Sequence, residues 1–255
     1  AVLCNIQAAF SNFELVFSFS SLVFVIIVPI LTMRTIAEER RQKTDQLLYS
    51  LPVTTTEIVL GKYLALLVVY LVPLCIISGY PLIFSLFGDV YLPTSYGSML
   101  AFFLLGAAFI AVGIFISSLT ESQGFAAGVT IALILFNYYS VSLSEYTSST
   151  MFGSLLAFYL MAIAAALVVR VLTKNDTLAW GVCIVLLLGI ALLCFFNSSL
   201  FEGLLPALME QLSLFDRFSS FVNGVFDMTT IVYYLSVIVF FLFLSVQSLE
   251  KRRYN

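Results

Sequence analysis

Residues 90–120 read VYLPTSYGSMLAFFLLGAAFIAVGIFISSLT and contain no charged side chain. A helix needs about 20 consecutive apolar residues to cross the hydrocarbon core of a bilayer, and this stretch is longer than that. The bilayer core offers no water to hydrogen-bond the backbone, so a spanning segment must satisfy its own N–H and C=O groups. The stretch therefore predicts a transmembrane α-helix.

The same pattern recurs along the whole chain. The 255 residues are 62% hydrophobic and 10% charged, whereas a soluble domain carries about 25% charged residues. The uncharged windows predict seven membrane spans, at about residues 12–33, 57–87, 98–118, 123–141, 151–172, 178–197 and 229–249. We therefore predict an all-α polytopic membrane protein in which residues 1–255 form a single transmembrane domain.

The basic residues fall almost entirely on one side of this topology. Of the eleven Lys and Arg residues, Arg217 lies on one side and ten lie on the other: Arg34, Arg40, Arg41, Lys43, Lys62, Arg170, Lys174, Lys251, Arg252 and Arg253. Cytoplasmic loops are enriched in Lys and Arg, so the side with ten is predicted to be cytoplasmic, together with the C-terminus. Seven spans then place Ala1 outside. We expect a further span upstream, which would make eight; the alternative is a mature chain whose signal sequence was removed.

The long polar segment between the first two spans holds the sequence AEERRQKTD. Thr35 and Glu38 fit a capping box, and Glu39 and Lys43 are spaced one helical turn apart as a favourable ion pair. We predict a charged helix over about residues 35–50 at the cytoplasmic membrane surface. The alternative interpretation is a solvated stretch that only sets the topology.

Two further segments have recognisable helix signals. Thr54 and Glu57 form a second capping box, at the start of a span that Pro73, Gly79 and Pro81 are expected to break or bend before its outer end. The segment 198–227 is apolar but interrupted by charges, and its leucines recur at helical spacing. It predicts short amphipathic helices in the outer interface, with a re-entrant-like character, before the last span.

Small and aromatic residues in the spans have packing interpretations. Gly124 and Gly128 form a G-x-x-x-G step that permits close helix packing, either within the chain or at a seam with a second copy. Tyrosines near span ends are interpreted as aromatic belts; they are Tyr138, Tyr139, Tyr233 and Tyr234. Ser78, Asn137 and Gln247 are polar but too scattered to predict a site.

The composition excludes several chemistries. The chain has no histidine, and its four cysteines are dispersed, so no catalytic residue and no metal site are predicted. It lacks the G-x-x-x-x-G-K-[ST] sequence of a P-loop, and therefore no ATP site of that kind is expected. The interiors of the spans are uncharged, which disfavours an ion-coupled secondary carrier.

The run LTMRTIAEERRQKTDQLLYSLPVTTTEIVLGKYLA, residues 31–65, resembles the cytoplasmic segment of ABC-2 type transporter permeases. The most similar group is the gliding-motility and nitrous-oxide-reductase-maturation type, whose pattern includes EER-x-x-[GK]-T. Further resemblances are ISSLTESQ at 116–123, DRFSSFVNGVFDMTTIVYYLS at 216–236 and the terminal LEKRR. Members of the group usually begin with a basic stretch and one more span, which this sequence lacks.

The resemblance implies a function for the chain. It would be the non-catalytic permease subunit of an ATP-binding cassette exporter, in a bacterial cytoplasmic membrane. Two permease copies, as a homodimer or a heterodimer, would pair with two ATPase subunits that carry ATP and Mg²⁺. No cofactor is expected in this chain, and no nucleic acid. The ATPase contact would involve Thr35, Glu38, Glu39, Arg40, Arg41, Lys43, Thr44 and Asp45. A membrane scaffold or sensor that transports nothing is the alternative, and the substrate is left open.

Overall fold

The computed structural model describes residues 16–17, 20–45, 52–86, 91–146, 151–173, 176–196 and 203–253. All regular structure in these residues is helical. The chain divides into two compact units: unit 1 comprises residues 1–138 and 214–255, and unit 2 comprises residues 139–213.

Unit 1 holds most of the membrane-spanning helices. Its elements are the 3-10 turn η2 (Ser21–Val23), α2 (Phe24–Thr32), α3 (Ala37–Arg41), α5 (Thr55–Ile77), α6 (Tyr80–Ser85), α7 (Leu92–Leu119), most of α8 (Gln123–Tyr146), α12 (Leu214–Val222) and α13 (Met228–Arg253). Five segments of the described chain are long and apolar enough to cross a membrane: Ser21–Arg41, Thr55–Ser85, Leu92–Leu119, Gln123–Tyr146 and Met228–Arg252. The protein is an all-α polytopic membrane protein, as its composition predicted.

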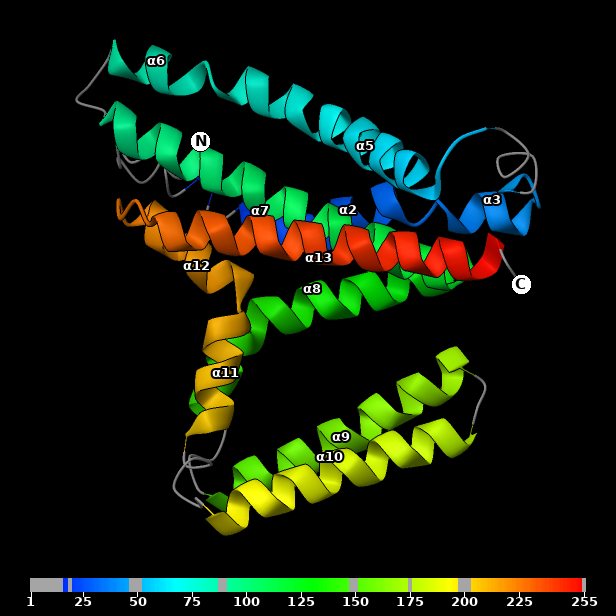
Figure 1. Cartoon of the computed structure of the whole chain (residues 1–255). Coiled ribbons are helices and arrows are strands. Elements are labelled where there is room, and N and C mark those ends of the chain that lie inside the picture. The colour runs from blue at the N-terminus through cyan, green and yellow to red at the C-terminus, as the bar shows by residue number, and fades with distance from the viewer. Residues whose placement is uncertain are drawn as a thin grey trace. The chain divides into compact units, whose positions relative to one another are not determined.

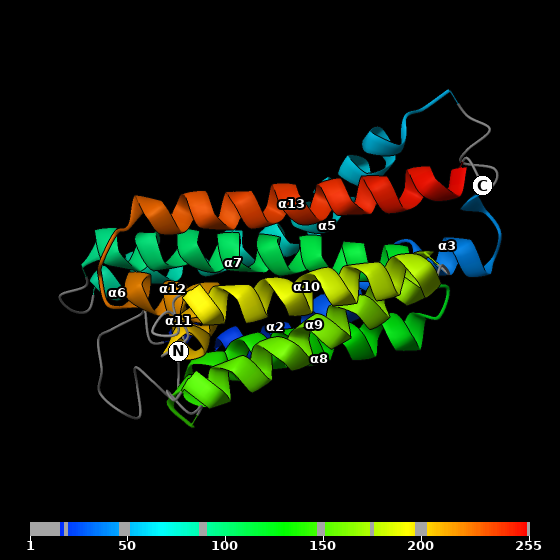
Figure 2. The same ribbon diagram turned by 60° about the horizontal axis from the view of Figure 1, so that its bottom comes forward.

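The uncharged helix α7 is the centre of unit 1. It contacts α2, α3, α5, α6, α12 and α13, and α13 runs along it in both Figure 1 and Figure 2. In its most apolar part 72% of the residues are buried, against 17% in the most apolar part of the segment Thr55–Ser85, which comprises α5 and α6. A helix that is apolar on every face can be covered by neighbours all round. The apolar residues that α5 leaves exposed, such as Leu64 and Val68, suit a helix that borders lipid.

The predicted signals at the two ends of the second span are confirmed. The Thr54 hydroxyl accepts a hydrogen bond from the N–H of Glu57, and the Glu57 carboxylate accepts one from the N–H of Thr54 at 2.8 Å, so the capping box is complete. Helix α5 ends at Ile77, and α6 begins after a turn that contains Gly79. Pro73 lies inside α5 without ending it.

Helix α12 belongs to the core of unit 1. Four of its side chains are buried: Leu214, Phe215, Phe218 and Phe221. The Phe215 ring lies 5.2 Å from that of Phe109 on α7, and the Phe218 ring lies 5.9 Å from that of Phe102. Short helices in the segment 198–227 are thus confirmed from residue 204 onward, residues 198–202 being outside the described part. The apolar face of α12 packs against α7. The prediction of an amphipathic helix in the outer interface did not include this contact.

Unit 2 is a separate helical assembly. Helices α9 (Met151–Thr173) and α10 (Asp176–Phe196) pack against each other, and α11 (Leu204–Leu212) contacts α9. Helices α9 and α10 occupy the ranges predicted for two spans, 151–172 and 178–197. Their lengths of 23 and 21 residues suit a crossing, and the crossing itself stays a prediction.

Candidate coupling site at one end of unit 1

Most of the charged residues that the structure describes in unit 1 lie at one end of its bundle, which we call the α3 end. It comprises α3, the first turns of α5, residues 118–123 and the last turns of α13, and Figures 1 and 2 show α3 there beside the C-terminus. Hydrogen bonds join these elements: the Thr55 hydroxyl lies 3.0 Å from the Glu250 carboxylate, and the Ser248 hydroxyl donates to the Ser118 carbonyl at 3.1 Å. Within unit 1, the segments that the basic residues predicted to share one side of the membrane therefore lie together, while the segment with Arg170 belongs to unit 2.

Helix α3 is shorter than the helix predicted over 35–50. It runs from Ala37 to Arg41, and residues 46–50 lie outside the described part of the chain. The first predicted capping box is wrong: the cap residue is Ile36, without a side-chain hydrogen bond, and the Thr35 hydroxyl instead donates to the Leu31 carbonyl. Thr35 thus extends the polar contacts of α2 and does not start α3.

The start of α3 is capped from a distant helix. The Ser117 hydroxyl on α7 accepts hydrogen bonds from the N–H groups of Ile36 and Ala37, at 3.2 and 3.1 Å. It also approaches the Met33 carbonyl at 3.4 Å. A serine oxygen that accepts from the first N–H groups of a helix performs the work of an N-cap, here from about 80 residues further along the chain.

The backbone conformation at the end of α3 explains why the predicted ion pair between Glu39 and Lys43 does not form. Lys43 has a φ of 57°, and its N–H bonds to the Arg40 carbonyl while that of Thr44 bonds to the Glu39 carbonyl. These two bonds form a Schellman motif, in which the left-handed residue is usually glycine. The predicted pair is wrong because this turn ends the helix before a further turn can bring Lys43 over Glu39.

Glu39 pairs with a different lysine. Lys62 of α5 forms an ion pair with the Glu39 carboxylate and donates a second hydrogen bond to the Thr35 carbonyl at 2.6 Å. The Lys62 side chain is only 16% exposed, so its charge is held where few waters reach it. Helix α3 is thereby fastened to α5 as well as to α7.

The residues predicted to contact the ATPase differ in their solvent exposure. Arg40 is buried, with 4% of its surface accessible, so it faces the protein. The side chains of Thr35, Glu38, Glu39 and Asp45 are half-buried, and those of Arg41, Lys43 and Thr44 are exposed. The part of this set that is open to another molecule is therefore basic.

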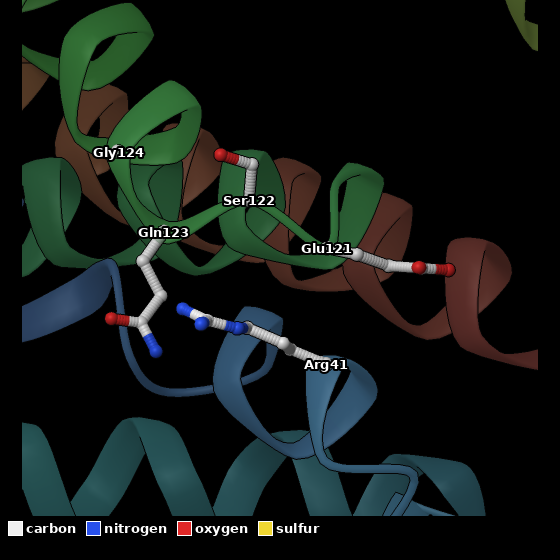
Figure 3. Close-up of a pocket in the computed structure, with 5 residues that line it drawn as sticks. All are labelled: Arg41, Glu121, Ser122, Gln123 and Gly124. Atoms are coloured by element: carbon white, nitrogen blue, oxygen red, sulfur yellow. The ribbon is translucent and has the colours of Figure 1, made fainter.

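A cleft lies beside Arg41. It has a volume of about 410 Å³ and is lined by Arg41, Glu121, Ser122, Gln123 and Gly124. Figure 3 shows the Arg41 side chain extending toward Gln123, while Glu121 points away from it. Glu121 pairs with Arg252 of α13 at 3.0 Å. Because that pair neutralises the acid, the charge left at the cleft is that of Arg41.

Within the described chain, close helix packing occurs at glycines other than Gly124 and Gly128, whose packing against a second copy stays a prediction. A Cβ atom on Gly124 or Gly128 would meet nothing within 4 Å in the described chain, so this step does not pack against another part of it. On α7, a Cβ on Gly106 would stand 2.7 Å from a ring carbon of Tyr70, and one on Gly113 would stand 2.7 Å from the Cβ of Thr32. A seven-residue spacing of Gly106 and Gly113 was the signal that could have indicated this face.

The opposite end of unit 1 contains polar contacts that the sequence analysis did not predict. Asn137 of α8 accepts a hydrogen bond from the N–H of Leu214 at 3.0 Å, and the Tyr234 hydroxyl donates to the Leu214 carbonyl at 2.8 Å. Tyr234 is fully buried, so its interpretation as an aromatic-belt residue is wrong. These two side chains instead position the first residue of α12.

A bundle of long apolar helices with a charged segment packed at one end defines a multi-pass membrane protein. The family of ABC-2 transporter proteins matches residues 5–142, more than half of the chain. The chain belongs to the ABC-2 family of transporter proteins. No curated protein and no solved structure matched it. The matched region includes α2, α3, α5 and α7, and hence the whole contact between α3 and its two neighbours.

Proposed function

We propose that the chain is the permease subunit of an ABC exporter and that α3, with the turn after it, docks on a separate ATPase subunit. ATP and Mg²⁺ would bind on that partner, and this chain would perform no chemistry. Two permease copies would assemble with two ATPases in a bacterial cytoplasmic membrane, with the α3 end and the C-terminus in the cytoplasm. Membership of the ABC-2 family supports the permease role.

The observation that carries the docking proposal is the two-sided character of α3. Its inner side is held by Ser117 and Lys62, while Arg41 and Lys43 are exposed. A segment that is anchored on one side can pass on a force applied to the other, because displacement is not lost in the rearrangement of a loose loop. Exposed guanidinium and ammonium groups fit a partner surface that carries carboxylates.

The test separates charge from backbone conformation. Arg41→Ala removes a charge from the cleft, and Lys43→Gly removes a charge while glycine keeps the left-handed turn at no steric cost. We expect the double variant to insert in the membrane normally and to co-purify with at least about tenfold less P-loop ATPase than wild type.

Lys251→Ala, which replaces an exposed lysine on α13 at the same end, is the matched control. Unchanged co-purification in the double variant would refute docking through this surface. Absence of any ATPase from wild-type preparations would favour the scaffold alternative.

A further inference from the structure

The contact between Ser117 and the turn that precedes α3 carries an inference about force transmission, which rests on the proposed function. We propose that Ser117 is the positioning residue through which a displacement of α3 moves the central helix α7. The covalent connections of α3 run to α2 and α5. The polar connection to α7 is a third route, and it leads to the helix with the most neighbours.

Ser117 closes the turn between α2 and α3 around a single oxygen. Its hydroxyl accepts from the N–H groups at the end of the turn, Ile36 and Ala37, and lies 3.4 Å from the carbonyl at its start, Met33. Ser117, Ala37 and Ile36 are all at most 3% exposed. Without the hydroxyl, two buried N–H groups would lose their acceptor, which makes rupture of this contact costly.

A second contact on the same face of α7 holds the other end of the turn. Gly113 lies four residues before Ser117, one helical turn away, and its missing side chain leaves room for Thr32, the last residue of α2. Thr32 is fully buried, and its hydroxyl donates to the Val28 carbonyl. The α2–α3 turn is therefore fastened to α7 at Thr32 by packing and at Ile36 and Ala37 by hydrogen bonds.

Helix α7 contacts several other helices to which a displacement can be transmitted. It contacts α5, α12 and α13 along its length, and the hydroxyls of Tyr63 and Tyr70 on α5 donate to its carbonyls of Ala107 and Phe102, at 3.3 and 2.8 Å. At its other end the Ser98 hydroxyl donates to the Phe221 carbonyl of α12. A shift that enters at Ser117 thus reaches the far end of unit 1 through one continuous helix.

The first experiment tests the contact in the permease alone. Ser117→Ala removes one oxygen, and we expect the amides of residues 36 and 37 to exchange with solvent deuterium about tenfold faster, because each has lost a buried acceptor. Ser118→Ala is the matched control: Ser118 is equally buried and adjacent, but its hydroxyl donates only within α7, to the Phe115 carbonyl. Ser117→Thr keeps the hydroxyl and should restore slow exchange. Equal exchange in the two alanine variants would overturn the proposal.

The second experiment tests transmission in the complex with the co-purified ATPase. Exchange is compared between the nucleotide-free complex and the complex trapped with ATP and vanadate. In wild type, peptides covering residues 33–41 and 110–119 should both respond to trapping. In Ser117→Ala the response of 33–41 should persist and that of 110–119 should fall at least threefold, whereas Ser118→Ala should behave as wild type.

The outcomes separate this inference from the proposed function. A full response of residues 110–119 in Ser117→Ala, or no response there in wild type while 33–41 responds, would overturn the role of Ser117 alone. Failure of the wild-type chain to bind an ATPase, or of 33–41 to respond, would refute the proposed function and this inference with it. A purely structural role for Ser117 would reduce both responses together and is thereby distinguished.

Discussion

Gly113 of α7 lies directly against Thr32, the last residue of α2. A Cβ atom on Gly113 would stand 2.7 Å from the Cβ and 2.8 Å from the Cγ2 of Thr32, and closer still to its hydroxyl. Thr32 is fully buried and cannot move its side chain into open space. The two helices therefore approach as closely as they do only because position 113 has no side chain.

Replacement of this glycine should destabilise unit 1. We expect Gly113→Ala to lower the free energy of unfolding by about 1–3 kcal/mol, because the added methyl group must displace helix α2 or the Thr32 side chain. Thermal unfolding of the detergent-solubilised protein measures the loss. Gly124→Ala is the control, since a Cβ there meets nothing within 4 Å. A Gly113→Ala protein as stable as the control would show that the helices can separate at no cost.

The ion pair between Lys62 and Glu39 should matter more than the pair between Arg252 and Glu121. The side chains of the first pair are 16% and 37% exposed, and those of the second are 42% and 63% exposed. We expect Lys62→Met to cost about 1 kcal/mol and Arg252→Met to cost less than about 0.5 kcal/mol, because water screens the exposed pair. Unfolding in low and high salt provides the measurement. Equal losses would show that burial of Lys62 adds nothing.

The two side chains that hold the start of α12 should stabilise it measurably. Tyr234→Phe removes the hydroxyl that donates to Leu214, and we expect a loss of about 1 kcal/mol. Asn137→Ala leaves the partly buried N–H of Leu214 without this acceptor and should cost about 1–2 kcal/mol. The rate at which a cysteine placed at the exposed Ser219 reacts with a thiol reagent reports local opening of α12. Tyr233→Phe is the control, and reaction rates equal to wild type in all variants would contradict the prediction.

The cap at the start of α13 should make stability depend on pH. The hydrogen bond from the main-chain N–H of Thr229, with those of the Thr229 and Thr230 side chains, holds the pKa of the Asp227 carboxyl below its usual value of 3.8. A lowered pKa means that the folded state favours the ionised form, so the stabilisation is present above pH 3.8 and is lost as the pH falls through the folded-state value.

Asp227→Ala should therefore have a lower melting temperature than wild type at about pH 6, and the difference should shrink toward about pH 3. Melting curves over this range test it. Asp227→Asn, whose amide oxygen can still cap the helix without titrating, should give a difference from Asp227→Ala that does not change with pH. A wild-type advantage that persists undiminished at low pH would contradict the role of the ionised carboxylate.

Local signals allowed much of the secondary structure to be predicted. The capping box of Thr54 and Glu57 and the break at Gly79 depend on residues within a few positions of one another, and both are confirmed. The box of Thr35 and Glu38 has the same local pattern and does not form. Its place is taken by Ser117, which lies 80 residues away from Ala37, and no local pattern contains that information.

The left-handed conformation of Lys43 at the end of α3 could be predicted only in part from the sequence. The family pattern that the segment resembles has glycine or lysine at the position of Lys43, and glycine is the residue most often found at a left-handed helix end. That alternative was a signal for the end of α3. The regular spacing of Glu39 and Lys43 favoured a longer helix instead, and in the structure Lys62 takes the role of the acid's partner.

The sequence by itself determined that the chain is a bundle of membrane helices, because a run such as 90–120 leaves the backbone no other way to satisfy its hydrogen bonds in lipid. It also determined that nearly all Lys and Arg residues lie on one side of the predicted topology. Only the tertiary structure decided which small and polar residues matter: Gly113 rather than Gly124, Ser117 rather than Thr35, and a buried Tyr234. The reason is physical. Hydropathy and charge act on each segment separately against the solvent, whereas a close approach or a hydrogen bond between helices depends on which faces meet.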